Sequence, residues 1–190
     1  MRDIAERFEV LRSLHHTDPT QLTQEEICRQ LHLELIVQDA RQLTISDGSV
    51  DFIVSNNTFE HVYPEVLRGI LERFWQLLRP GGLMSHFIDM SDHIAHMDPS
   101  INIYNFLQFS EKDWQRIDND IQPQNRWRMA HYRDLYEELG FPYEQRKLRP
   151  GGEAALRTVD VHEEFGHLSS KELAISHGYL LSRKEVSVKA

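Results

Sequence analysis

The stretch VDFIVSNNTFEHVYPEVLRGILERFWQLLRPGGLMSHFIDM, residues 50–90, decides the fold class. VDFIVS (50–55) and LMSHFIDM (83–90) are short runs rich in apolar, β-branched and aromatic residues, which is typical of strands. Between them, residues 64–78 repeat apolar side chains at helical spacing, and the RPGG that follows is suited to end a helix. A strand, a helix and a strand with glycine-marked turns predict an α/β fold with a mostly parallel sheet.

The sequence on both sides extends this alternation. LELIV (33–37) predicts a buried strand, and two helices precede it, over 2–15 and from a capping box at Thr23 and Glu26 to about Leu31. Downstream we expect a short helix after Ser110, a helix over 131–141, a strand near 143–148 and a final strand within 172–184.

These elements predict one domain over residues 1–190. We expect a helical segment over 1–32, a core over 33–148 and a C-terminal strand region over 149–190. The layer pattern predicts a Rossmann-like three-layer sandwich.

Composition excludes several classes of function. The formal net charge is −9, so the protein repels phosphate backbones, and we expect neither nucleic-acid binding nor membrane docking. No run approaches 18 apolar residues, and the N-terminus lacks the apolar core of a signal peptide. The single cysteine, Cys28, excludes an internal disulfide. We therefore expect a cytoplasmic protein.

Ligands of such sheets gather at the carboxyl ends of the strands. This rule selects three places: residues 39–41 after the first expected strand, 56–61 after the second, and 89–96 after the third. Asp39 and Asn56 should then lie on the same edge of one sheet. Each also has an ordinary alternative as a turn residue.

Residues 39–86, DARQLTISDGSVDFIVSNNTFEHVYPEVLRGILERFWQLLRPGGLMSH, resemble the central block of class I S-adenosylmethionine-dependent methyltransferases, in the small-molecule, type 11-like branch. The resemblance extends well over 33–148 and more loosely to residue 184. It implies methyl transfer from S-adenosylmethionine to a small-molecule or saccharide-linked acceptor, by direct attack of the acceptor on the cofactor methyl group.

The resemblance also assigns cofactor-binding residues. It implies that Asp39 contacts the adenine amine, that Ala40 and Arg41 line that pocket, and that Asn56 and Asn57 lie beside the methionine portion.

Further residues are candidates for substrate and catalysis. The resemblance places Glu60 and His61 near the mouth of the site, where His61 is either a general base or a structural histidine. Asn125, Arg126 and Arg128 follow the aromatic stretch in which the family inserts substrate-covering segments, so they are candidates for binding the acceptor; ordinary surface arginines are the alternative.

One part of the family pattern is missing. Family members carry a glycine-rich turn near the start, where the backbone approaches the cofactor, whereas no glycine precedes Gly48 here. We therefore expect a sheet truncated at its N-terminal strands and weak or no binding of S-adenosylhomocysteine. LELIV should then pair directly beside 50–55, with residues 2–31 packed over the sheet and a homodimer as an additional feature. Two functions stay open: a methyltransferase, and a non-catalytic methyltransferase-like binding or assembly module.

Histidines allow a rival interpretation. His86, Asp89, Asp92, His93 and His96 lie within eleven residues. Only the loop residues among them, at 92, 93 and 96, are placed to converge on a metal ion. Loop histidines are usually solvated, so we expect no metal and keep a metal-binding protein as the rival.

Overall fold

The chain forms two compact units, residues 1–39 and 40–190, and the structure, a computed structural model, describes residues 23–186. In the first unit, helix α2 (Gln24–Leu31) begins with the predicted capping box. The Thr23 hydroxyl accepts the Glu26 N–H, and the Glu26 carboxylate accepts the Thr23 N–H. This reciprocal pair satisfies two N–H groups that a helix start leaves unbonded. The helix predicted over 2–15 lies outside the described residues.

The strand predicted at 33–37 is wrong, and so is its pairing with residues 50–55. Residues 33–37 form neither helix nor strand, and within residues 23–186 the second predicted strand pairs only with residues of 78–87. A strand needs a neighbour that takes up its N–H and C=O groups. LELIV has the apolar composition of a strand, but the described part of its unit contains no neighbouring strand with which it could pair.

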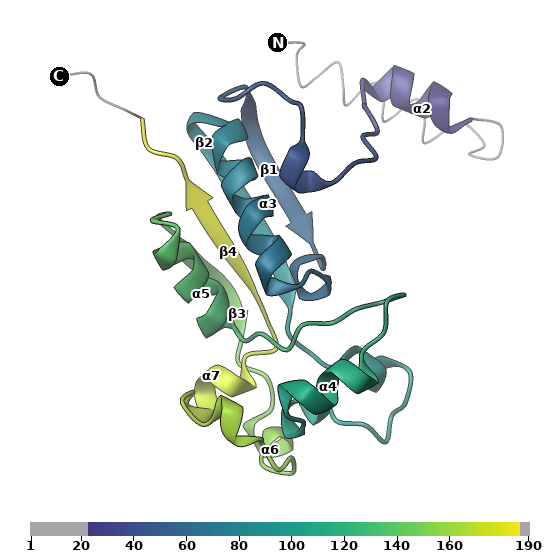
Figure 1. Cartoon of the computed structure of the whole chain (residues 1–190), viewed down its shortest axis with the longest axis vertical. Helices are drawn as coiled ribbons and strands as arrows, with labels where there is room; N and C mark the ends of the chain where they lie inside the picture. The colour runs from purple at the N-terminus through teal and green to yellow at the C-terminus, as the bar shows by residue number, and fades with distance from the viewer. Residues whose placement is uncertain (1–22, 187–190) are drawn as a thin grey trace. The chain divides into compact units, whose positions relative to one another are not determined.

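The second unit is built on a four-stranded sheet (Figure 1). Its strands are β1 (Val50–Asn56), β2 (Leu78–Asp89), β3 (Glu144–Arg149) and β4 (His177–Arg183), in the spatial order β1-β2-β4-β3. β1 and β2 are parallel, and helix α3 (Pro64–Leu77) connects them. β4 lies antiparallel between β2 and β3. The α/β class is thus confirmed, but the expected mostly parallel sheet is wrong, because the inserted β4 makes two of the three neighbouring pairs antiparallel.

Four further helices complete this unit: α4 (Glu111–Ile117), α5 (Met129–Glu138), α6 (Glu153–Leu156) and α7 (Ser170–Ala174). The Ser110 hydroxyl caps α4 at the predicted start. The final strand begins later than predicted, because α7, which the capping box of Ser169 and Glu172 starts, extends to Ala174 and takes up the first residues of the expected strand. Among residues 23–186, no helix is long and apolar enough to cross a membrane.

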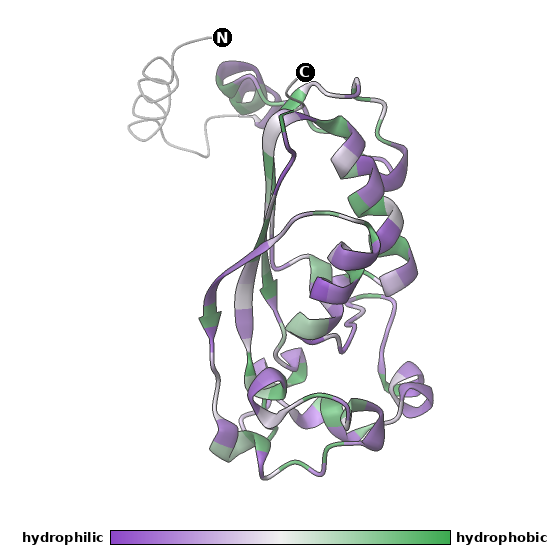
Figure 2. Ribbon diagram, turned by 90° about the vertical axis from the view of Figure 1, so that its left-hand side faces the viewer, coloured by the Kyte–Doolittle hydropathy of each residue, from purple (hydrophilic) through white to green (hydrophobic). Residues whose placement is uncertain are grey.

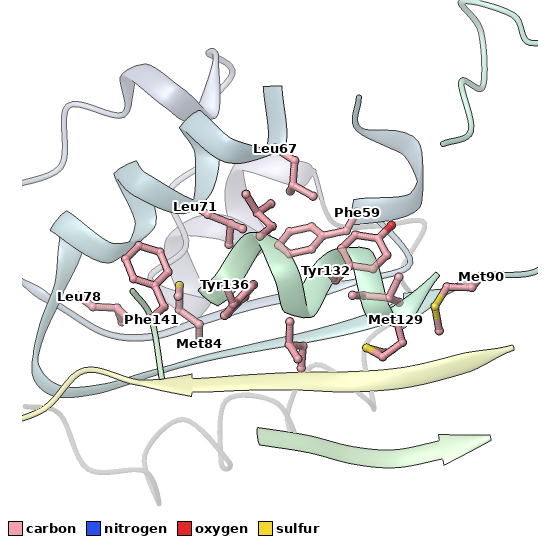
Figure 3. Packing of buried hydrophobic residues seen from close by; sticks show 13 residues of the cluster. Phe59, Leu67, Leu71, Leu78, Met84, Met90, Met129, Tyr132, Tyr136 and Phe141 are labelled. Carbon is pink, nitrogen blue, oxygen red and sulfur yellow. The ribbon is translucent and has the colours of Figure 1, made fainter. Parts of the chain in front are cut away.

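Helices α3 and α5 lie on the same side of the sheet (Figure 2). The main core fills the space between them and the strands (Figure 3). Leu67 and Leu71 from α3, Met84 from β2, and Tyr132 and Tyr136 from α5 are almost fully buried there. Each such side chain stabilises the fold by about 1.5–3 kcal/mol. This packing fixes β1 and β2 in register and so positions the loops at their carboxyl ends.

Candidate functional site

The carboxyl ends of β1 and β2 lie at one edge of the sheet, because the two strands are parallel. β1 ends at Asn56 and leads into the 3-10 turn η3 (Phe59–His61), and β2 leads into η4 (His93–His96). β4 starts at this edge, since Asp89 pairs with His177. The three strands bring together a group that we call the histidine–carboxylate cluster: Glu60, His61, Asp89, His93, His96 and His177.

Glu60 is the most buried acid of this cluster. Only 1% of its surface is exposed, and neither carboxylate oxygen has a hydrogen-bond partner among the described residues. Burial, with a smaller contribution from the Asp89 carboxylate, raises the pKa of Glu60 to about 7. A carboxyl group in this state is unusual in a folded protein and marks a functional region.

Asp89, in contrast, is well satisfied. Its Oδ1 accepts hydrogen bonds from the N–H (2.9 Å) and hydroxyl (2.6 Å) of Ser91 and lies 3.2 Å from His177 Nε2. Its Oδ2 lies 3.6 Å from His93 Nε2. Burial alone would raise the pKa of Asp89, but the contacts with His93 and Ser91 outweigh it and hold this pKa well below the usual range.

The two histidines beside Glu60 face one another. The ring centroids of His61 and His93 are 4.8 Å apart, with the rings nearly edge to face. His61 Nδ1 lies 2.8 Å from the Pro123 carbonyl oxygen. A carbonyl only accepts, so Nδ1 carries the hydrogen and Nε2 keeps its lone pair. The contact with Asp89 raises the pKa of His93.

A pocket of about 550 Å³ lies beside the cluster. Gln124 and Asn125 connect the two: the Gln124 side chain accepts the His93 N–H, and the Asn125 N–H donates to the Glu60 carbonyl. Aromatic side chains and acids dominate the lining, namely Tyr63, Trp114, Trp127 and Phe165 with Glu65, Glu111, Asp118, Asp120 and Glu164. The pocket is therefore negatively charged and partly apolar.

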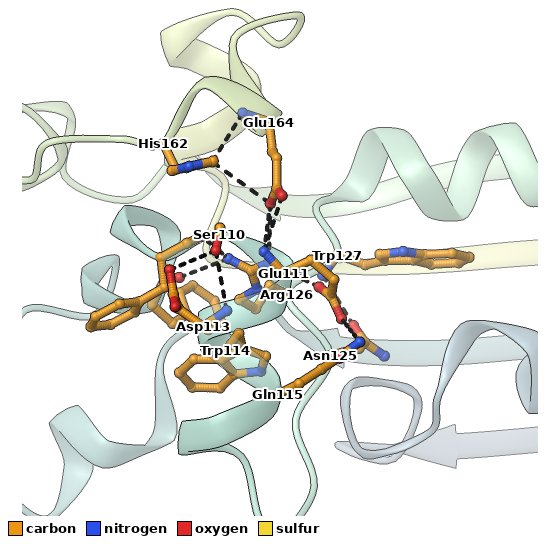
Figure 4. A network of polar contacts seen from close by, with 12 residues as sticks. Ser110, Glu111, Asp113, Trp114, Gln115, Asn125, Arg126, Trp127, His162 and Glu164 are labelled. Carbon is orange, nitrogen blue, oxygen red and sulfur yellow. Dashed lines mark hydrogen bonds and ion pairs between the residues drawn. The ribbon is translucent and has the colours of Figure 1, made fainter.

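Arg126 is the one arginine or lysine among the residues that line this pocket, and its charge is already paired (Figure 4). Its guanidinium donates to Glu111 (2.9 Å) and Glu164 (3.4 Å) and to the carbonyls of Phe106 and Phe109. The pairing leaves the other acids of the lining, such as Asp118, to set the charge that a ligand would encounter.

The comparisons with known proteins agree with this architecture. A family model described as "Methyltransferase domain" matches residues 8–85, which include β1, α3 and most of β2. The 1,6-didemethyltoxoflavin-N1-methyltransferase of Burkholderia thailandensis, solved with 1,6-didemethyltoxoflavin and S-adenosylhomocysteine, gives a TM-score of 0.50 at 12% identity. That match covers 89% of this chain and 58% of the other, and it shows a shared fold.

The expected resemblance to class I S-adenosylmethionine-dependent methyltransferases agrees with this family-model match over residues 8–85. A SAM-dependent methyltransferase from Archaeoglobus fulgidus matches with a TM-score of 0.49 and 12% identity, over 95% of this chain and 83% of that one. A possible exported protein from Bordetella parapertussis matches with a TM-score of 0.47 and 22% identity, over 89% of this chain. This chain spans about half the length of the Bordetella chain, 51%. No curated protein matches the chain.

The expected acceptor-binding residues hold main-chain groups. The Asn125 amide donates to the carbonyls of Phe59 (2.8 Å) and Val62 (2.7 Å). Arg128 is fully buried, and its guanidinium donates to three carbonyls. Asn125 and Arg126 line the pocket, whereas Glu60 and Arg128 do not. A role of these four residues in acceptor binding stays a prediction.

The expected cofactor residues fall in two places. Asn56 and Asn57 are exposed at the end of β1, and the Asn57 N–H donates to the Phe87 carbonyl. Ala40 and Arg41 form the 3-10 turn η2 (Ala40–Gln42), and the Arg41 side chain packs on α3. Asp39 belongs to the other unit and follows no strand, so its predicted common edge with Asn56 stays untested.

Sequence reasoning missed two members of this region. His177 comes from β4, and only the insertion of that strand beside β2 brings it to Asp89. Gln124 contacts the loop after β2 twice, because its amide donates to the Ser91 carbonyl and its side-chain oxygen accepts the His93 N–H. Asp92, expected to converge with the histidines, instead accepts hydrogen bonds from the Ile94 N–H and the Asn105 amide. For His177, the only local signal was the position of its partner Asp89 at a strand end.

Proposed function

We propose that this protein serves S-adenosylmethionine-dependent methyl transfer by holding a small-molecule or saccharide-linked acceptor in the pocket beside the cluster. The observation that carries the proposal is the place of this pocket. Its lining residues Gln124 and Asn125 hydrogen-bond with the loops that follow β2 and β1, and the family model for methyltransferases matches residues 8–85 of the chain. Ligands of α/β folds gather at the carboxyl ends of the strands. A cytoplasmic location and a homodimer are part of the same proposal.

The lining favours acceptors that donate hydrogen bonds. Carboxylates and amide oxygens are acceptor groups, and they outnumber the free donors of the pocket. Trp114 and Trp127 add flat apolar surfaces, and aromatic faces attract cations. An amine or a hydroxyl-rich group meets both requirements. In direct transfer such a group attacks the methyl carbon, and the protein contributes orientation of the two reactants.

We expect acceptors to compete with a side chain that fills the pocket. Gln115 lines the pocket from α4. We expect wild type to bind small amines and sugars in ligand-observed NMR, and Gln115→Trp should abolish this binding. The matched control is Lys112→Ala on the same helix, because Lys112 is exposed and does not line the pocket. Ligands that bind both variants equally would place the acceptor site elsewhere.

The residues present fit S-adenosylmethionine only in part. Asn56 and Asn57 are free to contact a ligand at the end of β1, but no glycine occurs among residues 1–47. Glycine is what lets a backbone approach a nucleotide closely, and its loop amides hold the cofactor. We therefore derive no catalytic step through the cofactor. The same observation favours the second candidate function, a non-catalytic methyltransferase-like binding module.

We expect S-adenosylhomocysteine to bind the 190-residue chain without saturation at about 1 mM, because each missing charge-assisted hydrogen bond costs about 1.5–3 kcal/mol. Isothermal titration calorimetry measures this, and the Burkholderia enzyme, solved with S-adenosylhomocysteine, serves as positive control. A micromolar dissociation constant would contradict the expectation and favour the enzyme over the binding module.

A further inference from the structure

The histidine–carboxylate cluster contains a set of side chains with the geometry of a metal site. One ligand atom each from Glu60, His61 and His93 lie within 4.8 Å of one another. We propose that these three side chains bind a divalent transition-metal ion of the zinc type. The site lies beside the acceptor pocket, to which Gln124 and Asn125 connect it, and it does not depend on methyl transfer.

The Glu60 carboxylate is the observation that points to a ligand. Glu60 is 1% exposed, and both of its oxygens lack a hydrogen-bond partner within residues 23–186. Buried acids are otherwise paired, hydrogen-bonded or bound to a metal ion. A Glu60 carboxylate oxygen lies within 4.8 Å of an imidazole nitrogen of His61 and of His93, but it forms no hydrogen bond with either ring. A cation between the three groups would supply the missing partner.

Both histidines are prepared to act as ligands. The Nδ1–H of His61 donates to the Pro123 carbonyl, which fixes the ring and leaves Nε2 with its lone pair. Metal-bound histidines commonly donate their other N–H to a carbonyl in this way. His93 Nε2 is buried and has no hydrogen-bond partner in the described part of the chain.

A second set, Asp89, His93 and His96, shares His93 but fits less well. Asp89 already accepts two hydrogen bonds from Ser91, and the His96 side chain is 57% exposed and contacts the Ser91 hydroxyl. These groups have partners without a metal ion. Asp89 then adds negative charge next to His93 and strengthens the attraction for a cation.

The ligand atoms determine the class of metal. Two imidazoles and one carboxylate suit Zn²⁺, Co²⁺, Ni²⁺ or Fe²⁺, whereas Mg²⁺ and Ca²⁺ prefer oxygen ligands alone. Three protein ligands also leave one position of a tetrahedral zinc ion for water.

The test uses the full chain after treatment with a chelator. Co²⁺ titration should give the intense visible absorption of a four- or five-coordinate site with about one equivalent bound, and Zn²⁺ should displace it and raise the melting temperature. Glu60→Gln and His93→Gln should each weaken Co²⁺ binding at least tenfold. Glu60→Gln keeps the shape and removes the buried acid, so its folded state is retained. His167→Gln, outside both sets, is the control and should bind as wild type does.

Two results would overturn the proposal. One is Co²⁺ binding that Glu60→Gln and His93→Gln leave unchanged. The other is binding lost in Asp89→Asn and His96→Gln but kept in Glu60→Gln, which would place the metal ion in the second set.

Discussion

Replacing Arg128 by methionine is expected to lower the free energy of unfolding by about 3–5 kcal/mol. The guanidinium is fully buried and donates to the carbonyls of Met90, Leu173 (2.7 Å) and Ile175. Methionine fills a similar volume but leaves the three carbonyls without a donor, and each unsatisfied buried group costs about 1–3 kcal/mol. Arg128 therefore joins the start of α5 to the segments around β2 and α7.

Urea denaturation followed by tryptophan fluorescence measures this change. Arg116→Met is the matched control, because the Arg116 side chain is 70% exposed and its loss should cost less than about 0.5 kcal/mol. A loss below about 1 kcal/mol for Arg128→Met, together with lost ligand binding, would support the acceptor-binding role that the family resemblance implies.

Acid is expected to destabilise the fold through His86, by about 2 kcal/mol at pH 5. His86 lies inside β2, stacks on Phe59 at 4.2 Å and hydrogen-bonds with the Ser55 hydroxyl at 2.8 Å. Burial lowers the pKa of His86 to about 3. Between pH 6.5 and 3 the unfolded chain binds a proton that the folded chain does not. Stability is therefore complete above pH 6.5 and falls as pH decreases, by about 1.4 kcal/mol per pH unit.

The measurement is urea unfolding of wild type and His86→Phe at pH 8, 6 and 5. Phenylalanine keeps the stacking and loses the Ser55 contact, so the variant should be about 1 kcal/mol less stable at pH 8. Its stability should then depend less on pH than that of wild type. Equal slopes for the two proteins would show that other groups cause the acid sensitivity.

The order of elements from 50 to 90 was predictable because each depends on local sequence. An apolar stripe specifies α3 almost independently of the rest of the fold, whereas Pro80-Gly81-Gly82, expected as a turn, belongs to β2. LELIV at 33–37 shows the opposite case, since strand composition gives a strand only where a neighbour supplies hydrogen bonds. The antiparallel pairing of β4 was not predictable, because it depends on contacts far apart in sequence.

In the site, too, the features that depend on local sequence were predictable and those that depend on distant contacts were not. The position of Glu60 and His61 after β1 followed from the strand and turn pattern. The burial of Glu60 did not, because it depends on β2 and on the segment at 124–125, which no local pattern connects to it. The sequence also made Arg128 a candidate for binding the acceptor. Its hydrogen-bond partners are carbonyls, which only the tertiary structure brings together.

The central place of β4 has a consequence for the order in which the sheet assembles. Leu83 pairs with Arg183, a hundred positions along the chain, and β3 joins the sheet only through β4. During synthesis on a ribosome, β1 and β2 can pair early, but within residues 23–186 β3 has no neighbouring strand until β4 emerges. Closing so long a loop also slows folding. A nascent chain therefore holds an open half-sheet until β4 has emerged, and in that interval it exposes unpaired strand edges.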